Sequence, residues 1–450
     1  MREHEYQELA AGVVKQAKAR GADEAECTVS EGDEFSVTVR MREIETLKDA
    51  GSRGAGVRVL VGARQGSSYT SDLTPEGLGR MIDSALELAR LTTDDPHAGL
   101  PDREELGSAP GPLDLYCDDI AALSTEVKIR MAKDAEAASF AVDPRIANSE
   151  GATFASHLGL HAFANSRGFA GAYRATSCSL SSVPVARDGE SMERDYWYTA
   201  ARSAARLEPP EQVGRIAAER ALRRLNARKV ETTRVPVVFE PRTAATLIGS
   251  IFDAASGDSI YRKASFLTGK LGQRIASECV TVIDDATMPG LFGSSPFDDE
   301  GVPSRRTVVI DRGVLASYLL NSYTARKLGL KTTGNASRGL TGNAGVGHGN
   351  LYLVGGEKPA EEILRSVRRG LLVTELMGSG VNIVTGDYSR GAAGLWIEDG
   401  QPVFAVSEVT ISGNLPDMLD GVESVGSDLE FRSSVAAPTL LIREMTVSGR

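Results

Sequence analysis

The stretch TELMGSGVNIVTGDYSRGAAGLWIEDG, which spans Thr374–Gly400, decides how the C-terminal half of the chain folds. It holds six glycines, the polar run Asp-Tyr-Ser-Arg and a tryptophan. Asp399-Gly400 lies between the apolar runs LWI and VFAV, and this dipeptide is a strong signal for a two-residue β-hairpin. The other glycines allow tight turns between buried strand positions, which we expect at Val373, Leu376, Val381, Ile383 and Val384.

The whole chain of 450 residues is predicted to be an α+β protein of three domains. The first domain, 1–110, reads as an amphipathic helix, four short strands separated by Gly- and Asp-containing turns, and a helix that begins after Pro75. The second, 113–228, is a β-rich region with flanking helices. The third, 232–450, begins with a strand and a helix over Thr243–Ala255, and continues as mostly antiparallel strands with Gly-rich loops.

The charge balance argues against a nucleic-acid partner. Asp and Glu outnumber Lys and Arg by 61 to 50, which gives a formal charge of -11, and such a surface repels phosphate backbones. One local cluster of basic residues is better explained as the solvated C-terminal end of a helix; it comprises Arg215, Arg220, Arg223, Arg224, Arg228 and Lys229. We therefore predict no binding to nucleic acid.

The sequence also indicates the compartment. The N-terminus lacks the apolar segment of a secretory signal, and no apolar run approaches the ~18 residues that a membrane helix needs. The four cysteines lie far apart and suit reduced, mostly buried thiols. We expect a cytoplasmic protein without membrane attachment.

Two clusters contain residue types that bind metals. His157 and His161 are four residues apart, but their surroundings favour a strand, on which the two imidazoles would stand about 13 Å apart, too far for one ion. Asp298, Asp299 and Glu300 could serve as a metal or acid–base group, yet the prolines and glycine around them favour an ordinary polar turn. We predict no metal site and no catalytic residue in this chain.

The segment 332–350, TTGNASRGLTGNAGVGHGN, is a second glycine-rich loop. Its glycines permit close backbone approach to a ligand. It matches neither the P-loop nor the dinucleotide fingerprint, so a substrate-edge or interface loop is the better interpretation. Asn335 and His348 are its candidate contact residues.

Five segments in this order resemble the TldD/PmbA family and, within it, the PmbA (TldE) branch. They read GSSPFDDEG, SYTARKLGLKTTGNA, VTELMGSGVNIVTGDYSRGAAGLWIEDG, ISGNLPDM and VGSDLEFRSS. The likeness runs over essentially the whole chain and is strongest from about residue 232 onward. It implies a subunit of a cytoplasmic zinc metallopeptidase in which a TldD chain and a TldE chain pair, and whose substrates are extended, unfolded or modified peptides.

The branch rests on missing residues. TldD chains carry H-E-x-x-x-H on the helix after the first strand of the third domain, and a further cysteine ligand near the C-terminus. Gly249, Ser250 and Ala254 stand roughly where H, E and H would be, and the last cysteine of this chain is Cys279. None of the three can bind zinc or act as a general base. The resemblance therefore implies zinc in a TldD-type partner and none in this chain.

The resemblance also assigns a role to the polar run in the opening stretch. It implies contacts with a peptide or a partner chain, whereas an internal pair between Asp387 and Arg390 is the structural alternative. The candidate contact residues are Asp387, Tyr388, Ser389, Arg390, Asn335 and His348.

Three functions follow. The first is a helper subunit that pairs with a TldD-like chain in a heterodimer. A homodimer of the isolated chain stays open. The second is an independent metallohydrolase that uses His348, Asp298 or Glu300. The third is a non-enzymatic binding protein, in line with the name "modulator of DNA gyrase" attached to the family.

Overall fold

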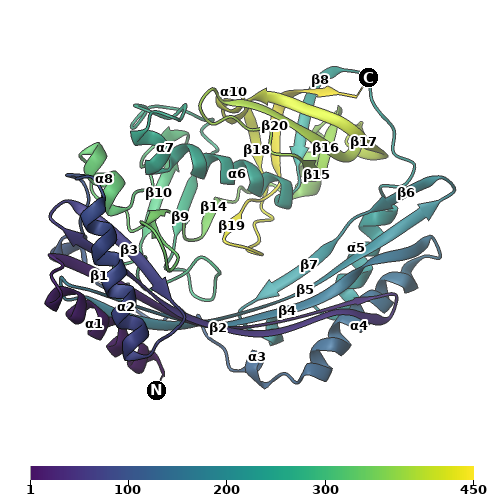
Figure 1. Cartoon of the computed structure of the whole chain (residues 1–450). Helices are drawn as coiled ribbons and strands as arrows, with labels where there is room; N and C mark the ends of the chain where they lie inside the picture. The colour runs from purple at the N-terminus through teal and green to yellow at the C-terminus, as the bar shows by residue number, and fades with distance from the viewer. Residues whose placement is uncertain (1, 450) are drawn as a thin grey trace.

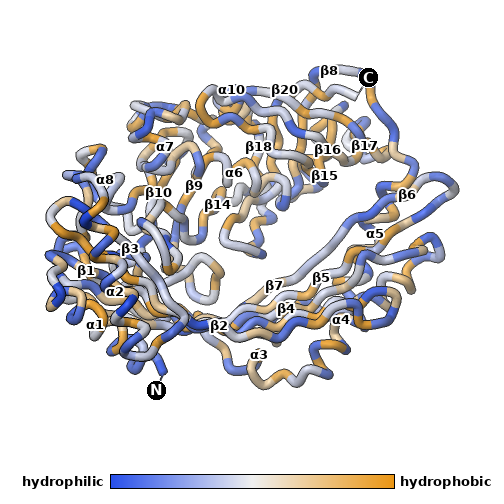
Figure 2. The backbone as a smooth tube through the Cα atoms, viewed as in Figure 1, coloured by the Kyte–Doolittle hydropathy of each residue, from blue (hydrophilic) through white to orange (hydrophobic). Residues whose placement is uncertain are grey.

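A seven-stranded antiparallel sheet runs through the N-terminal half of the chain (Figure 1), which the computed structural model describes over residues 2–449. Its strand order is β3-β2-β1-β4-β5-β6, and β7 also pairs with β5. Buried and partly exposed residues alternate along β5 from Thr176 to Ala186, as they do in a strand with one buried face. Hydrophilic and hydrophobic residues are interspersed along the strands of this sheet (Figure 2). The strands are β1 (Glu24–Arg40), β2 (Glu43–Val61), β3 (Arg64–Thr70), β4 (Ile146–Asn165), β5 (Ala170–Asp188), β6 (Ser191–Arg194) and β7 (Trp197–Ala201).

The first domain contains two long strands, β1 and β2, where we predicted four short ones, so that prediction was wrong. The residues read as turns, Gly32, Asp33 and Gly51, lie in mid-strand, where Asp33 pairs with Gly51 across β1 and β2. Gly32 is small for a packing reason: a Cβ atom there would lie 2.9 Å from Cε1 of His157 on β4. A glycine that makes room for a neighbouring ring has the same sequence signature as a glycine in a turn.

Helices cover one face of this sheet along its whole length (Figure 1). One apolar core lies under α1 and α2, and a second lies under α3, α4 and α5. The predicted ranges 1–110 and 113–228 share the sheet, because β1 pairs with β4 from Glu26↔Asn165 to Val39↔Ala152. The helices are α1 (Arg2–Ala19), α2 (Pro75–Leu91), α3 (Asp119–Ala122), α4 (Thr125–Val142) and α5 (Pro210–Leu222). No helix within residues 2–449 is long and apolar enough to cross a membrane.

The C-terminal domain is built from two larger sheets around the helix α6 (Pro241–Ala255), whose apolar side is buried in the largest core of the molecule. The predicted helix and the mostly antiparallel strands are confirmed. Among the strands described for this domain, β8–β15 and β14–β19 are the pairs that run parallel. One sheet joins β17 (Gln401–Asn414), β16 (Asp387–Glu398), β15 (Arg369–Met377), β8 (Thr233–Phe239), β20 (Leu440–Ser448) and β18 (Val422–Val425). The other joins β11 (Val314–Leu315), β10 (Arg306–Asp311), β9 (Val282–Asp285), β14 (Leu351–Leu353) and β19 (Val435–Ala436).

The smaller elements of this domain lie in its loops. The strands β12 (Ala336–Ser337) and β13 (Gly345–Val346) form a short hairpin within the glycine-rich segment 332–350. The short helices are α7 (Gly257–Tyr261), α8 (Ser322–Leu328), α9 (Ala360–Ser366) and α10 (Leu415–Asp420).

The opening stretch forms β15, a loop and the β16–β17 hairpin. The predicted turn at Asp399-Gly400 is confirmed, with φ angles of 46° and 78°. The strand positions predicted at Val381, Ile383 and Val384 are wrong, because these residues lie in the loop between β15 and β16, where Val384 is 54% exposed. Glycines with positive φ at both ends of that loop end the extended chain.

Candidate functional site

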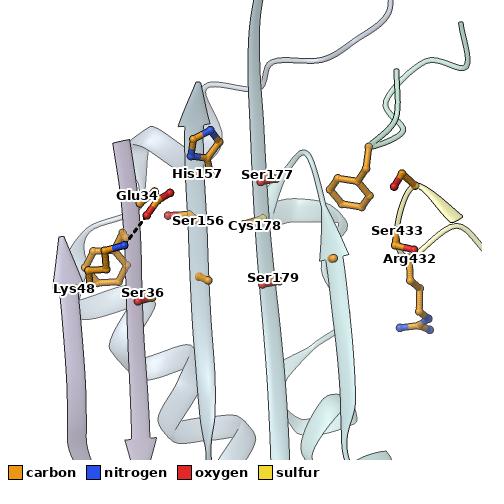
Figure 3. A pocket seen from close by; sticks show the side chains of 15 residues that line it. Glu34, Ser36, Lys48, Ser156, His157, Ser177, Cys178, Ser179, Arg432 and Ser433 are labelled. Atoms are coloured by element: carbon orange, nitrogen blue, oxygen red, sulfur yellow. Dashed lines mark hydrogen bonds and ion pairs between the residues drawn. The ribbon is translucent and has the colours of Figure 1, made fainter. Parts of the chain in front are cut away.

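The sheet face that the helices leave free turns toward the C-terminal domain (Figure 1). A cavity of about 530 Å³ opens between this face and the segment 432–434. Its floor comes from β1, β4 and β5 (Figure 3) and consists mainly of small polar side chains, including Ser36, Ser177 and Ser179. Large side chains on the same strands, such as Phe154 and Leu180, point to the opposite, helix-covered core. Small side chains leave the floor open to a ligand that lies flat on it.

The charged groups of the floor are few. Glu34 and Lys48 form an exposed ion pair of 2.7 Å (Figure 3). The ring of His157 lies against Gly32 and Gly159, and a Cβ at either position would come within 3 Å of it. The ring of His157 therefore has room at the floor because both neighbouring positions are glycines, of which Gly32 was read from the sequence as part of a turn.

His157 and His161 share a face of β4 but have different surroundings, as the strand spacing predicted. His161 Nε2 lies 3.5 Å from Asp299 Oδ1, and its ring contacts Tyr173 and Phe297. Burial lowers the pKa of His161, although Asp299 opposes that shift. The two imidazoles do not converge on one point.

Arg432 joins the C-terminal segment beside the cavity to the sheet. Its Nη2 lies 2.7 Å from Oε1 of Glu208, its Nη1 donates to the carbonyl oxygen of Tyr198, and its guanidinium stacks over Trp197 at 4.3 Å. The role of Arg432 was not predicted from the sequence, because no pattern near it indicates partners that lie more than two hundred positions away in the chain.

The three α6 positions at which the sequence lacks metal ligands are Gly249, Ser250 and Ala254, and each has clear surroundings in the structure. Gly249 presents no side chain, and the space beside it is open. Ser250 is buried and donates its hydroxyl to the carbonyl oxygen of Thr246 at 3.1 Å. Ala254 is fully buried in the core. These three residues offer no imidazole, thiolate or carboxylate, so they do not fit a zinc ion.

Arginines crowd the start of α6. Arg220 and Arg242 donate to Oε1 of Glu240 at 2.6 and 3.1 Å, and both also lie within 3.4 Å of the Asp195 carboxylate. Burial raises the pKa of Glu240, but the neighbouring guanidinium groups outweigh it and hold that pKa below its usual range. The cavity of about 250 Å³ at this place is lined by Arg220, Arg242 and Arg432 together with Glu240 and Glu430, so its charges are largely paired.

The predicted contact residues 387–390 alternate between two environments on β16. Asp387 is exposed and accepts a hydrogen bond from Thr385 Oγ1 at 2.6 Å, so the alternative pair with Arg390 does not form. Ser389 is exposed as well, whereas Tyr388 is buried, and burial raises the pKa of its hydroxyl to about 12. Arg390 is half-buried on the side of Tyr388.

Asn335 and His348 lie in the loop 332–350 as neighbours of a buried carboxylate. Asn335 is buried, and its Nδ2 donates to Oδ2 of Asp284 at 2.7 Å. Gly349 donates to the other oxygen of Asp284, also at 2.7 Å, and burial raises the pKa of that carboxyl group. The His348 ring packs edge-on against Phe252 of α6 at 4.8 Å. Asn335 therefore holds the loop in shape, while His348 is the more accessible of the two.

The acidic group at 298–300 is a turn, as predicted, but a buried one. The carbonyl oxygen of Asp298 accepts the N–H of Gly301 at 2.9 Å, and its carboxylate accepts backbone N–H groups of Glu300, Val302 and Ala336. Burial and the nearby Glu300 raise the pKa of Asp298 well above its usual range. The carboxylate oxygens of Asp298 therefore accept hydrogen bonds from backbone N–H groups and hold the loop in its conformation.

The fold and these segments match one family in all three parts of the chain. Models of the PmbA/TldA metallopeptidase match domain 1 over residues 25–89, the central domain over 118–225 and the C-terminal domain over 232–449. The protein thus has the domain set of a metallopeptidase family.

The chain belongs to the PmbA/TldD family. It is 41% identical to the metalloprotease PmbA of Escherichia coli O157:H7 over 95% of its own length and 93% of that protein. A crystal structure from Bacteroides thetaiotaomicron, described as a modulator of DNA gyrase, superposes with a TM-score of 0.92 at 28% identity and covers 100% of both chains. TldE from Thermococcus kodakarensis shares the fold, with a TM-score of 0.88 at 22% identity over 98% of this chain and 100% of that one.

Proposed function

We propose that this chain is the TldE-type subunit of a cytoplasmic zinc peptidase, and that it binds peptide while a TldD-type partner cleaves it. The observation that carries the proposal is the composition of α6. At the three positions where a TldD-type motif would place its ligands and base, the chain has Gly249, Ser250 and Ala254.

The donor chemistry supports this division of labour. A catalytic zinc ion takes imidazole, thiolate or carboxylate ligands and lowers the pKa of a bound water. On α6 the only side-chain oxygen at those positions belongs to Ser250, and the helix backbone already uses it.

The free face of the sheet supports a peptide-binding role. Its serines and glycines leave room for an extended chain, and their hydroxyls offer hydrogen bonds that do not select particular side chains. Arg432 fixes the opposite wall, so the cavity keeps its width. A substrate held there would be defined by its extended backbone rather than by its sequence.

The test is reconstitution. The purified chain, a TldD-type chain from the same organism, and their mixture are each incubated with an unfolded peptide, with and without a chelator. We expect a heterodimer by light scattering and chelator-sensitive cleavage only when the TldD-type chain is present.

The same experiment distinguishes the alternatives. Chelator-sensitive cleavage by this chain alone, lost in His348→Ala, would replace the proposal with an independent metallohydrolase. Capture of gyrase without any hydrolysis by the mixture would replace it with a non-enzymatic binding protein.

A further inference from the structure

Two glycines of the seven-stranded sheet share one neighbour, the ring of His157. Gly32 on β1 and Gly159 on β4 lie opposite each other in the strand register. A Cβ atom at Gly32 would meet Cε1 of His157 at 2.9 Å, and one at Gly159 would meet Nε2 at 2.8 Å. At both positions the three nearest heavy atoms all belong to this ring. The ring of His157 therefore lies over the glycine pair, close to the backbone of the sheet.

The backbone does not require glycine at either position. Gly32 and Gly159 are absent from the glycines with positive φ, so another residue could adopt the same conformation. Glycine in mid-strand destabilises the sheet, because it has no side chain to pack and loses the most conformational freedom on folding. What requires glycine here is the space that the ring occupies. Glycines of this kind in a strand often mark a place that a ligand approaches.

The nitrogen atoms of the His157 ring are not used within the chain. The residue is exposed on the floor of the cavity of about 530 Å³, and no hydrogen bond joins its ring to another residue in the range 2–449. Its neighbours across the sheet are Glu34 and Ser177 (Figure 3). Glu34 accepts a hydrogen bond of 2.7 Å from Lys48. A neutral imidazole carries one donor and one acceptor, so the ring can bind both polar atoms of a peptide group.

The larger cavity, of about 820 Å³, lacks this feature at two of its charged residues, Arg58 and Asp95. Arg58 donates to Glu26 at 2.7 Å and to Gln65 at 3.3 Å. Asp95 accepts from the hydroxyl of Tyr323 at 2.8 Å. Both groups are therefore engaged with protein partners, whereas His157 stands free in its cavity.

We propose that His157 binds the main chain of the peptide in the cavity of about 530 Å³, through hydrogen bonds from its ring nitrogens to peptide groups. This rests on the proposed function, because it assigns one residue of that site. The charged neighbours are paired, Lys48 with Glu34 and Arg432 with Glu208, so the ring and not a charge holds the ligand. Recognition of the main chain makes the contribution of His157 independent of the side chains of the peptide.

Peptide binding to the full-length chain alone tests the role of the ring nitrogens. Fluorescence anisotropy gives the affinity for two labelled unfolded peptides of equal length, one rich in alanine and one rich in glutamine. We expect His157→Ala and His157→Phe to weaken both peptides equally, by about three- to tenfold, because both variants lack the nitrogens. His4→Ala, at an exposed histidine of α1, is the matched control.

Three results of this titration would overturn the proposal. The first is a wild-type chain that binds neither peptide. The second is a His157→Phe variant with wild-type affinity, because a ring without nitrogen would then suffice. The third is a loss confined to one of the two peptides, because the contact would then be with side chains.

The substitution Gly159→Ala tests the place of the ring. The added Cβ would overlap the His157 ring, which can turn aside as a side chain does, so the variant should fold and bind both peptides about as weakly as His157→Ala. In the His157→Ala background the same substitution should cause no further loss. Equal losses in both backgrounds would show that Gly159 does not act through the ring, which contradicts the proposal. Melting curves confirm that each variant folds.

The assembled complex separates this inference from the proposed function. With a TldD-type chain present, His157→Ala should raise KM by about three- to tenfold and leave kcat unchanged, because the ring acts on binding alone. Peptide binding through His157 in a complex that never cleaves would sink the proposed function and leave the inference intact. Cleavage with an unchanged KM in His157→Ala would sink the inference and leave the proposed function intact.

Discussion

Arg390 Nη1 donates a hydrogen bond of 3.3 Å to Thr246 Oγ1, and this contact joins β16 to the exposed side of α6. The Nε of Arg390 is buried without a partner among the described residues, as is the hydroxyl of the neighbouring Tyr388. The guanidinium thus lies between the buried hydroxyl of Tyr388 and α6.

Replacing Arg390 with Ala should impair the assembled peptidase more than the folding of this subunit. A single half-exposed hydrogen bond contributes no more than about 1 kcal/mol to the free energy of unfolding. The measurements are the melting temperature, the affinity for the TldD-type chain and the cleavage rate. Thr246→Val is the control, since it removes the same hydrogen bond and keeps the guanidinium. If both variants leave affinity and rate unchanged, residues 387–390 have only a structural role.

Replacing Arg432 with Ala should destabilise the chain by about 2–4 kcal/mol, because it leaves Glu208 without its charged partner and removes the stacking on Trp197. Chemical denaturation gives the loss. Arg312→Ala, at an arginine whose side chain is 82% exposed, should change stability by less than about 0.5 kcal/mol. Equal effects of the two substitutions would contradict the anchoring role of Arg432.

Raising the pH should cost stability through Glu300. Burial raises the pKa of this carboxyl group in the folded chain, although Arg58 opposes the shift, so the folded state retains its proton to a higher pH than the unfolded state does. This contribution is full below the unfolded pKa of about 4.3 and is lost as the pH rises through the folded value. Glu300→Gln should flatten the decline between pH 4.5 and 8. If the free energy of unfolding has the same pH dependence in the wild-type chain and in Glu300→Gln, this role of Glu300 is refuted.

A side chain at Gly56 should separate β2 from the loop that follows β12. A Cβ atom there would overlap the backbone of Leu340, which cannot withdraw as a flexible side chain could. We expect Gly56→Ala to lower the free energy of unfolding by at least about 2 kcal/mol. Gly12→Ala is the control, because that helical glycine has open space around it and should gain up to about 1 kcal/mol. Similar melting temperatures for the two variants would contradict this prediction, because they would show that the backbone at Leu340 moves aside at little cost.

Local periodicity was sufficient to predict the helix α6 and the β16–β17 hairpin. The apolar side of α6 and the Asp399-Gly400 turn depend on neighbours within a few residues, so the sequence carries their signal directly. The long strands were misread because Gly32 and Gly51 serve packing across the sheet, and their partners lie on other strands.

The two cavities could not be predicted for the same reason. Arg58 is held by Glu26 and Gln65, which lie on other strands, and Arg432 by residues far earlier in the chain. Residue type alone marks an arginine as exposed. The chemistry of Gly249, Ser250 and Ala254, by contrast, can be judged from residue type alone, and the absence of zinc from this chain stays a prediction.

The pairing of β1 with β4 has a consequence for synthesis on the ribosome. Glu26 emerges long before its partner Asn165, and at about 5–20 residues per second the delay is on the order of ten seconds. During that interval β1 has an open edge, the kind of surface on which nascent chains associate wrongly. The N-terminal sheet therefore cannot be completed until β4 has been synthesised. A translational pause between β1 and β4 would lengthen the time during which the open edge of β1 is exposed to chaperones.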